Sequence, residues 1–193
     1  MNRVRVINWE NIYLAVPEKK DAELRFKNLN DLEVQQYLSI WWNIMTLEWE
    51  EQFYEESMKN PNKKLFVICS KNVENDMWNI ITEENIWTIE LNINQRHRNW
   101  ELWIVIFNKE YRNKWYWTES IKLMISYWFD VLGLHKIFLH YIDYNWRWEK
   151  VYNKCWFREV WVRKEHWYLW WEYHNVVEME ILRSEYLGLK DWE

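Results

Sequence analysis

Apolar residues recur along the chain with two different periods, and these periods predict helices and strands. The clearest helix is predicted over 118–132, where apolar residues recur at helical spacing along one face. Gly133 follows the last of them and is the expected left-handed C-terminal residue. Nearly continuous apolar runs at 64–70 and 99–107 predict centrally buried strands, and 86–93 is a third strand-like run between them.

The segments on either side of this middle region predict a mixed pattern. Thr46 is a suitable N-cap for a helix that ends near Asn60, because three glutamates place negative charge in its first turn. The run from Val4 to Val16 is predicted as one strand, and Asn145 is predicted to cap a short helix. The stretch 72–85 stays open between a turn and a short strand. The other predicted elements are a helix at 19–29 and strands at 135–142, 157–163 and 176–182. Together they predict a mixed three-layer α/β domain.

Composition narrows the class of protein. A chain of 193 residues with 49% hydrophobic residues has enough apolar material for one core, so a single domain over 1–193 is expected. The net charge of -5 argues against nucleic acid or an anionic membrane as the main partner and suits a cationic amine. No apolar stretch is long enough for a membrane span and the charged start lacks an apolar signal run, so a cytoplasmic protein is expected.

Residues that commonly hold metals are few, and their spacing does not suit a metal site. Cys69 and Cys155 are the only cysteines, and we interpret both as reduced, buried thiols. The 5 histidines show none of the spacings of a zinc site. No metal is therefore expected.

Glycine is far rarer than in an ordinary globular protein. The chain has 2 glycines against 19 tryptophans, whereas average usage would give roughly 13 glycines at this length. Backbone positions with positive φ normally require glycine. This imbalance leads to the hypothesis of an engineered, heavily mutated or computationally generated sequence.

Four longer stretches carry a family pattern: VINWENIYLAVPEKKDAEL at 6–24, RNWELWIVIFNKEYRNKWYWTESIKLM at 98–124, YWFDVLGLHKIFLHYIDYNWRWEKVYNKCWF at 127–157 and REVWVRKEHWYLWWEYHNVVEMEILRSEY at 158–186. Together they resemble the GNAT superfamily of N-acetyltransferases over about residues 5–186. The similarity is strongest to the ribosomal-protein alanine acetyltransferase (RimJ/RimL-type) branch and extends to spermidine acetyltransferases. It implies a mixed central sheet, flanked by helices and splayed into a V between the strands near 99–107 and 135–142.

The resemblance places a pyrophosphate-binding loop just before the 118–132 helix. The family pattern is Arg or Gln, two residues, Gly, one residue, then Gly or Ala. The corresponding residues here are Arg112, Asn113, Lys114, Trp115, Tyr116 and Trp117, followed by Thr118. Backbone N–H groups at the helix start would hold the phosphates of acetyl-CoA. Trp115 and Trp117 stand at the two small positions and are expected to weaken that binding.

Tryptophan also stands at other positions where relatives commonly carry small residues. The glycine positions are Trp103, Trp128, Trp156, Trp161, Trp170 and Trp171, and the alanine positions are Trp100 and Trp148.

The resemblance also implies the catalytic groups. Tyr152, seven residues after Asn145, occupies the position that protonates the departing thiolate, although a core tyrosine on an apolar stripe is the alternative. Glu101 corresponds to an acidic residue that often acts as the base, although it could also be a solvated strand carboxylate. The backbone of Ile104, Val105 and Ile106 would pair with the pantetheine arm, and Asn145 would contact CoA.

These residues lead to one main expectation and two alternatives. The main expectation is transfer of acetyl from acetyl-CoA to a primary amine, either a protein N-terminus or a small molecule. One alternative is acetylation of a polyamine such as spermidine. The other is a non-catalytic or engineered GNAT scaffold whose tryptophans fill the cofactor cleft. The oligomeric state is left open, with a homodimer included.

Overall fold

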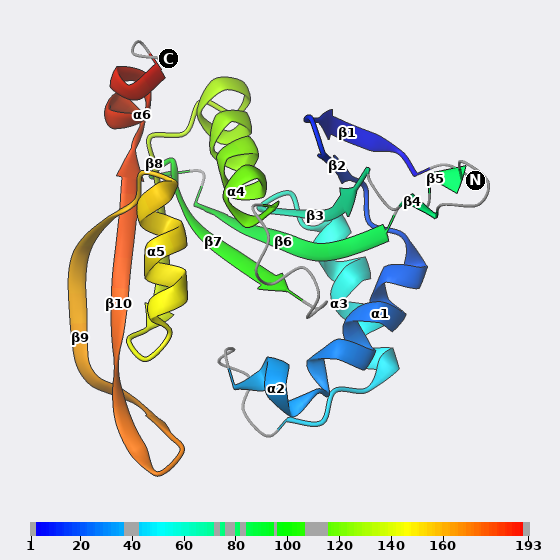
Figure 1. Cartoon of the computed structure of the whole chain (residues 1–193), viewed down its shortest axis with the longest axis horizontal. Helices are drawn as coiled ribbons and strands as arrows, with labels where there is room; N and C mark the ends of the chain where they lie inside the picture. The colour runs from blue at the N-terminus through cyan, green and yellow to red at the C-terminus, as the bar shows by residue number, and fades with distance from the viewer. Residues whose placement is uncertain are drawn as a thin grey trace. The chain divides into compact units, whose positions relative to one another are not determined.

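The computed structural model describes residues 3–36, 43–71, 74–75, 80–81, 84–94, 96–106 and 116–190. An eight-stranded mixed sheet runs in the order β1-β2-β3-β6-β7-β8-β10-β9, flanked by helices (Figure 1). The chain forms two compact units, unit 1 with Met1–Leu91 and Trp103–Tyr116 and unit 2 with Asn92–Leu102 and Trp117–Glu193. The sheet confirms the predicted mixed α/β class. None of the described helices is long and apolar enough to cross a membrane.

The first strands of unit 1 form a hairpin, where the sequence predicted one strand. β1 (Arg5–Asn8) pairs antiparallel with β2 (Ile12–Ala15), and the N–H of Trp9 donates to the carbonyl of Ile12 at 3.0 Å. The prediction was wrong because the turn contains neither glycine nor proline, the residues that usually mark a reversal. β2 then pairs with β3 (Lys63–Ser70), and its four side chains are all buried.

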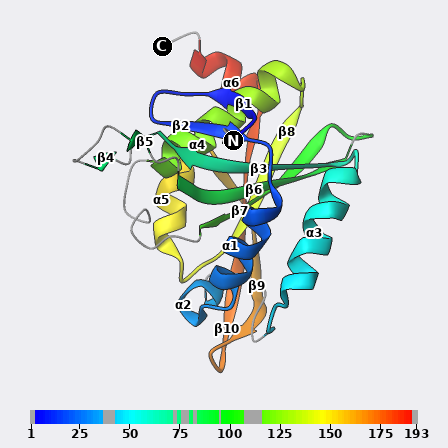
Figure 2. The same ribbon diagram turned by 90° about the vertical axis from the view of Figure 1, so that its right-hand side faces the viewer.

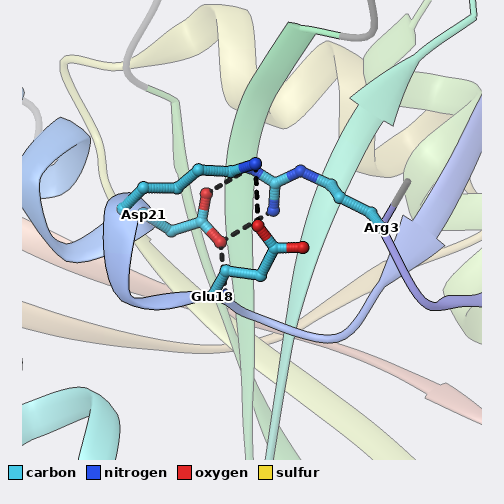
Figure 3. A network of polar contacts seen from close by, with 4 residues as sticks. Arg3, Glu18 and Asp21 are labelled. Carbon is cyan, nitrogen blue, oxygen red and sulfur yellow. Dashed lines mark hydrogen bonds and ion pairs between the residues drawn. The ribbon is translucent and has the colours of Figure 1, made fainter. Parts of the chain in front are cut away.

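A buried ion pair fixes the start of helix α1 (Lys19–Leu29) in unit 1 (Figure 3). Glu18 is the N-cap and forms a reciprocal capping box with Asp21. Arg3 donates to both carboxylate oxygens of Asp21, at 2.8 and 2.5 Å. Burial alone would lower the pKa of Arg3, but the hydrogen bonds and charge of Asp21 outweigh it and raise that pKa. The guanidinium therefore stays charged and satisfies a carboxylate that is almost completely buried.

Helix α3 (Leu47–Lys59) begins as predicted, because the side chain of Thr46 accepts from the N–H of Trp49 at 3.2 Å. α1 and α3 lie side by side (Figure 2). Ala22, Tyr54 and Leu65 form a buried cluster between these helices and β3. Helix α2 (Leu32–Gln35) of unit 1 was not predicted. β4 (Glu74–Asn75) and β5 (Ile80–Ile81) lie in the stretch 72–85 that the sequence left open, and β5 agrees with its short-strand alternative.

β6 (Glu84–Asn94) and β7 (Asn99–Ile106) each have residues in both units. In unit 2, residues Asn99–Glu101 of β7 pair in parallel with Lys136–Phe138 of β8 (Lys136–Ile142). The recorded ladder stops at Glu101 and Phe138, although both strands continue through described residues.

A long hairpin follows in unit 2, formed by β9 (Arg158–Leu169) and β10 (Glu172–Leu182) and continued by α6 (Arg183–Lys190) (Figure 1). Both strands are longer than predicted, and α6 was not predicted. Trp170 and Trp171 form the two-residue turn with φ of 51° and 68°, and Trp156 has φ of 67°. The family resemblance implied glycine at these three positions. Their positive φ is a backbone conformation that glycine adopts without strain.

The predicted 118–132 helix consists of α4 (Tyr116–Ser126) and a π-helical turn (Tyr127–Val131). Gly133 follows with φ of 63°, as predicted. Trp128 in the π-helical turn and Trp100 on β7 are both buried, and neither indole N–H has a hydrogen-bond acceptor in the described structure. A buried donor without an acceptor costs about 1–3 kcal/mol, so these two indoles fill the core at an energetic cost.

Candidate active site

Glu101 lies where the β7–β8 ladder ends. Its Oε1 is 2.6 Å from Nε2 of His140, which lies on β8 two residues beyond Phe138, the last paired residue. Side-chain exposure is 25% for Glu101 and 19% for His140. The carboxylate is therefore partly buried and bonded to an imidazole, unlike a solvated strand carboxylate.

The same face of β8 and β10 carries two further ion pairs in unit 2. Lys136 Nζ is 2.5 Å from Glu180, and the guanidinium of Arg163 is 3.2 Å from Glu178. Glu178 lies directly opposite His140 in the β8–β10 ladder. The other side of β8 packs into the core, since Ile137 and Leu139 are buried. The sheet face next to Glu101 is thus polar and mostly charge-balanced.

Tyr152 belongs to an aromatic cluster on α5 (Trp146–Lys154), and only 5% of the residue is exposed. The indole of Trp148 stacks on its ring at 5.3 Å, and Phe157 packs edge-on at 5.9 Å. Burial raises the pKa of Tyr152 strongly, with smaller contributions from Cys155 and Tyr141. A phenol in this environment keeps its proton, as an acid that protonates a thiolate must.

Cys155 is an inert thiol. It is fully buried, and its Sγ lies 3.7 Å from the carbonyl oxygen of Thr118. Burial raises its pKa to about 12, against the opposing charges of Lys122 and Lys154. The thiol is therefore protonated at neutral pH and has no thiolate character. Cys69 is likewise buried and free, so the predicted state of both cysteines agrees with the structure.

Asn145 occupies the N-cap position of α5 but caps it differently from the prediction. Its side chain makes no capping hydrogen bond. The backbone carbonyl does this instead, because it accepts from the N–H of Trp148 at 2.9 Å, while the N–H of Asn145 donates to Ile142 at 2.8 Å in the preceding turn. Asn145 is 7% exposed, and its amide is not used in capping.

The phosphate loop is described only at its end. Arg112, Asn113, Lys114 and Trp115 lie outside the described residues, and of Tyr116 only its helical backbone is described. Trp117 is 6% exposed, and its indole packs edge-on against Trp148 with ring centroids 4.3 Å apart. Trp117 is thus part of the aromatic cluster that surrounds Tyr152.

The described residues fit acetyl-CoA at two points. The first turn of α4 offers N–H groups and the positive end of a helix dipole, which suit a phosphate. Tyr152 is protonated at neutral pH, because burial raises its pKa. Ile104 is a buried β7 residue of unit 1, whereas Val105 and Ile106 are described only as strand backbone. Among the described residues, no group of three or more His, Cys, Asp or Glu side chains could hold a metal ion.

Two side-chain pairs were missed from the sequence, one in each unit. His140 carried no local signal, because its link to Glu101 depends on the pairing of strands distant in sequence. Glu50 is one of the glutamates in the helix that follows Thr46, and it is 4% exposed and lies 2.6 Å from Arg25 in unit 1. Burial raises the pKa of Glu50, and the charge of Arg25 opposes that rise.

Comparison with known proteins identifies relatives over nearly the whole chain. The chain is 28% identical over 181 residues to a spermidine N(1)-acetyltransferase of Vibrio cholerae, with 92% of this chain and 98% of the relative covered. A crystal structure of the Vibrio cholerae spermidine N-acetyltransferase with CoA and spermine matches with a TM-score of 0.78 and 25% identity, covering 92% of this chain and 98% of that one. A dodecameric structure of the enzyme from the same organism matches with a TM-score of 0.75 at 25% identity, over 93% and 98%.

These relatives correct two sequence-based expectations. They are spermidine acetyltransferases, so the specific similarity to the ribosomal-protein alanine acetyltransferase branch is not supported. The hypothesis of an engineered origin has no support either. The family model described as the acetyltransferase (GNAT) domain matches residues 11–158. Since that match spans well over half of the chain, the protein belongs to the GNAT family of acetyltransferases.

Proposed function

We propose that this N-acetyltransferase uses acetyl-CoA to acetylate a polyamine of the spermidine kind. The observation that carries the proposal is the full-length similarity to a spermidine N(1)-acetyltransferase, 28% identical over 92% of this chain. The net charge of -5 agrees with a cationic substrate. The polyamine alternative is therefore better supported than the broader main expectation, which was a primary amine on a protein N-terminus or a small molecule.

The proposed chemistry needs one base and one acid. Acetyl-CoA, when bound, supplies an acetyl group activated as a thioester. Glu101 accepts a proton from the substrate ammonium, and the electron pair of that N–H bond stays on the nitrogen, which then attacks the thioester carbonyl. Tyr152 gives its phenolic proton to the sulfur as the carbon–sulfur bond breaks. Burial raises the pKa of Tyr152, so the phenol carries its proton when the thiolate forms.

Binding of the co-substrate is assigned to the same residues as in the sequence-based proposal. The N–H groups of Tyr116, Trp117 and Thr118 would face the phosphates, and Arg112 and Lys114 would add positive charge. The backbone of 104–106 would pair with the pantetheine arm. Self-association is also proposed, because a Vibrio cholerae relative forms a dodecamer.

The test is acetyl transfer to a panel of amines. Release of the CoA thiol is measured with spermidine, spermine and a peptide with N-terminal alanine, using the parent protein and Glu101→Gln. We expect kcat/KM for spermidine to exceed that for the peptide at least tenfold, and Glu101→Gln to lose about 10²–10⁴-fold, the usual effect of a general base. A preference for the peptide would contradict the acceptor class. No transfer to any amine, with no acetyl-CoA binding by titration calorimetry, would indicate a non-catalytic scaffold.

A further inference from the structure

The β9–β10 hairpin of unit 2 (Figure 1) carries four exposed aromatic residues at its tip. They are Tyr168, Trp170, Trp171 and Tyr173, which come from the last part of β9, the turn and the first part of β10. Each of them is between 50% and 87% exposed. Tyr168 lies directly opposite Tyr173 in the ladder, and their ring centroids are 5.0 Å apart. These four residues, called the tip cluster below, therefore lie together at the end of the hairpin.

The turn of the hairpin holds its two indoles in a strained backbone. Trp170 and Trp171 both have positive φ, a conformation that disfavours any residue with a Cβ. Trp171 is the most exposed residue of the tip cluster, so burial of its indole within this chain offsets little of that strain. Backbone strain of this kind is concentrated at functional positions. The strained turn therefore points to a contact outside the chain.

The area of the tip cluster suits a second protein surface. An aromatic side chain buries about 150–250 Å² when it is fully covered. At their observed exposure, the four residues together offer roughly 500 Å² in one copy. Contact between the tip clusters of two copies would bury roughly 1,000 Å², which is the lower limit of a specific protein–protein interface.

The charges around the tip cluster favour a second copy of this chain over other macromolecules. Lys164, Glu165 and Glu172 are the exposed charged neighbours of the turn. One cation beside two carboxylates is not the cluster of Lys and Arg that attracts an anionic membrane or a phosphate backbone. In a two-fold contact the same patch lies on both sides, so an aromatic patch is its own complement.

We propose that the tip cluster is the surface through which two copies of this chain associate. This inference names the surface for the self-association proposed above and rests on that proposal. Trp171 contributes most to the contact, because it has the most surface to bury and because tryptophan is enriched among the residues that dominate interface energetics. Burial of its indole against the second copy also offsets the strain of the turn.

The test is sedimentation equilibrium of the full chain over a hundredfold range of protein concentration. Trp171→Lys removes the indole and places like charges on both sides of a two-fold contact, so the dissociation constant should rise at least tenfold above that of the parent. Trp161→Lys is the matched control, since Trp161 is an exposed indole on β9 outside the tip cluster. It should associate like the parent. Trp171→Phe keeps an aromatic ring and should associate more tightly than Trp171→Lys.

Each outcome decides the role of the tip cluster. Equal dissociation constants for the parent and a folded Trp171→Lys, checked by circular dichroism, would overturn the proposal and leave self-association to another surface. A parent that stays monomeric throughout would overturn both.

Hydroxyl-radical footprinting of the parent decides the question if Trp171→Lys does not fold. Oxidation of Trp171 should fall as protein concentration rises, whereas oxidation of Trp161 should not change. Constant oxidation of Trp171 in an associated parent would overturn the proposal. None of these measurements requires acetyl transfer, so an inactive parent would contradict the proposed chemistry and not the interface.

Discussion

The indole of Trp148 stacks on the ring of Tyr152, with centroids 5.3 Å apart and an interplanar angle of 20°. Trp117 packs edge-on against Trp148, with ring centroids 4.3 Å apart. The ring of the candidate acid therefore stacks on one indole, and a second indole packs against the first. The phenol is buried and keeps its proton, but the indoles occupy space beside it. Tyr152 thus has both an acidic role to test and a structural role in the cluster.

Replacement of Tyr152 by phenylalanine separates these two roles. Tyr152→Phe keeps the ring that stacks on Trp148 and removes only the proton, so kcat should fall by about 10²–10⁴-fold. The affinity for acetyl-CoA, measured by titration calorimetry, should change little. Tyr141→Phe is the matched control, because Tyr141 packs against Tyr152 at 6.1 Å and burial raises its pKa to about 12. Equal rates for both variants and the parent would assign Tyr152 to the core alone.

The two glycines should respond in opposite directions to alanine. Gly133 has φ of 63°, whereas Gly188 lies within α6, and an added Cβ would meet nothing within 4 Å at either position. The effect of alanine on stability therefore depends on backbone conformation and not on a steric clash. Gly133→Ala should lower the free energy of unfolding by about 1–2 kcal/mol because of left-handed strain. Gly188→Ala should raise it by about 0.5–1 kcal/mol through helix propensity. Urea unfolding checks both values, and a shift of the same sign in the two variants would contradict the argument.

The hairpin turn offers the converse experiment at Trp171. This residue has φ of 68° and is 87% exposed, so its side chain contributes little burial. Trp171→Ala removes the indole but keeps the Cβ, whereas Trp171→Gly removes both. The glycine variant should be more stable than the alanine variant by about 1 kcal/mol, since two-residue hairpin turns with positive φ favour glycine. Equal unfolding midpoints for the two variants would show that the turn is not strained.

Local signals explain what the sequence predicted well. Thr46 caps a helix with its own side chain, and Gly133 ends one with its own left-handed backbone. Both were predicted in the role that the structure shows. The family strings likewise predicted the mixed sheet. The hairpin within 4–16 was missed because no glycine or proline marks its turn.

Long-range signals explain what the sequence did not predict. The bond between Glu101 and His140 depends on the parallel register of β7 and β8, which no local pattern encodes. The buried pair of Arg25 and Glu50 is similar, since it joins α1 and α3 across unit 1. Acidic residues on a helix are usually solvated, so only tertiary packing distinguishes Glu50 from its exposed neighbours. The roles of Arg112 and Trp115 stay predictions, because both lie outside the described residues.

Asp130 should make the stability of unit 2 depend on pH. Its Oδ2 accepts from Tyr186 at 2.8 Å and from Lys190 at 2.9 Å, which ties α6 to the π-helical turn. Burial acts to raise the pKa of Asp130, but the bonds from Lys190 and Tyr186 outweigh it and lower that pKa. A carboxyl group with a lowered pKa in the folded state stabilises the protein above its unfolded-state value. That stability is lost as pH falls through the folded-state value.

Asp130→Asn should therefore be less stable than the parent at pH 7, and the difference should shrink as pH falls below about 4, where an aspartate in the unfolded chain takes up its proton, and vanish below the folded-state pKa. The difference at pH 7 should be below about 1 kcal/mol, because the carboxylate is partly exposed and solvent screens the ion pair. Tyr186→Phe keeps the ring that stacks on Phe129 at 5.1 Å and removes one of the two bonds, so it should lose part of the same pH-dependent stability. Urea unfolding at pH 7 and pH 3 in low salt measures each difference. A deficit for Asp130→Asn that is as large at pH 3 as at pH 7 would show that it comes from lost packing and not from the charge of Asp130.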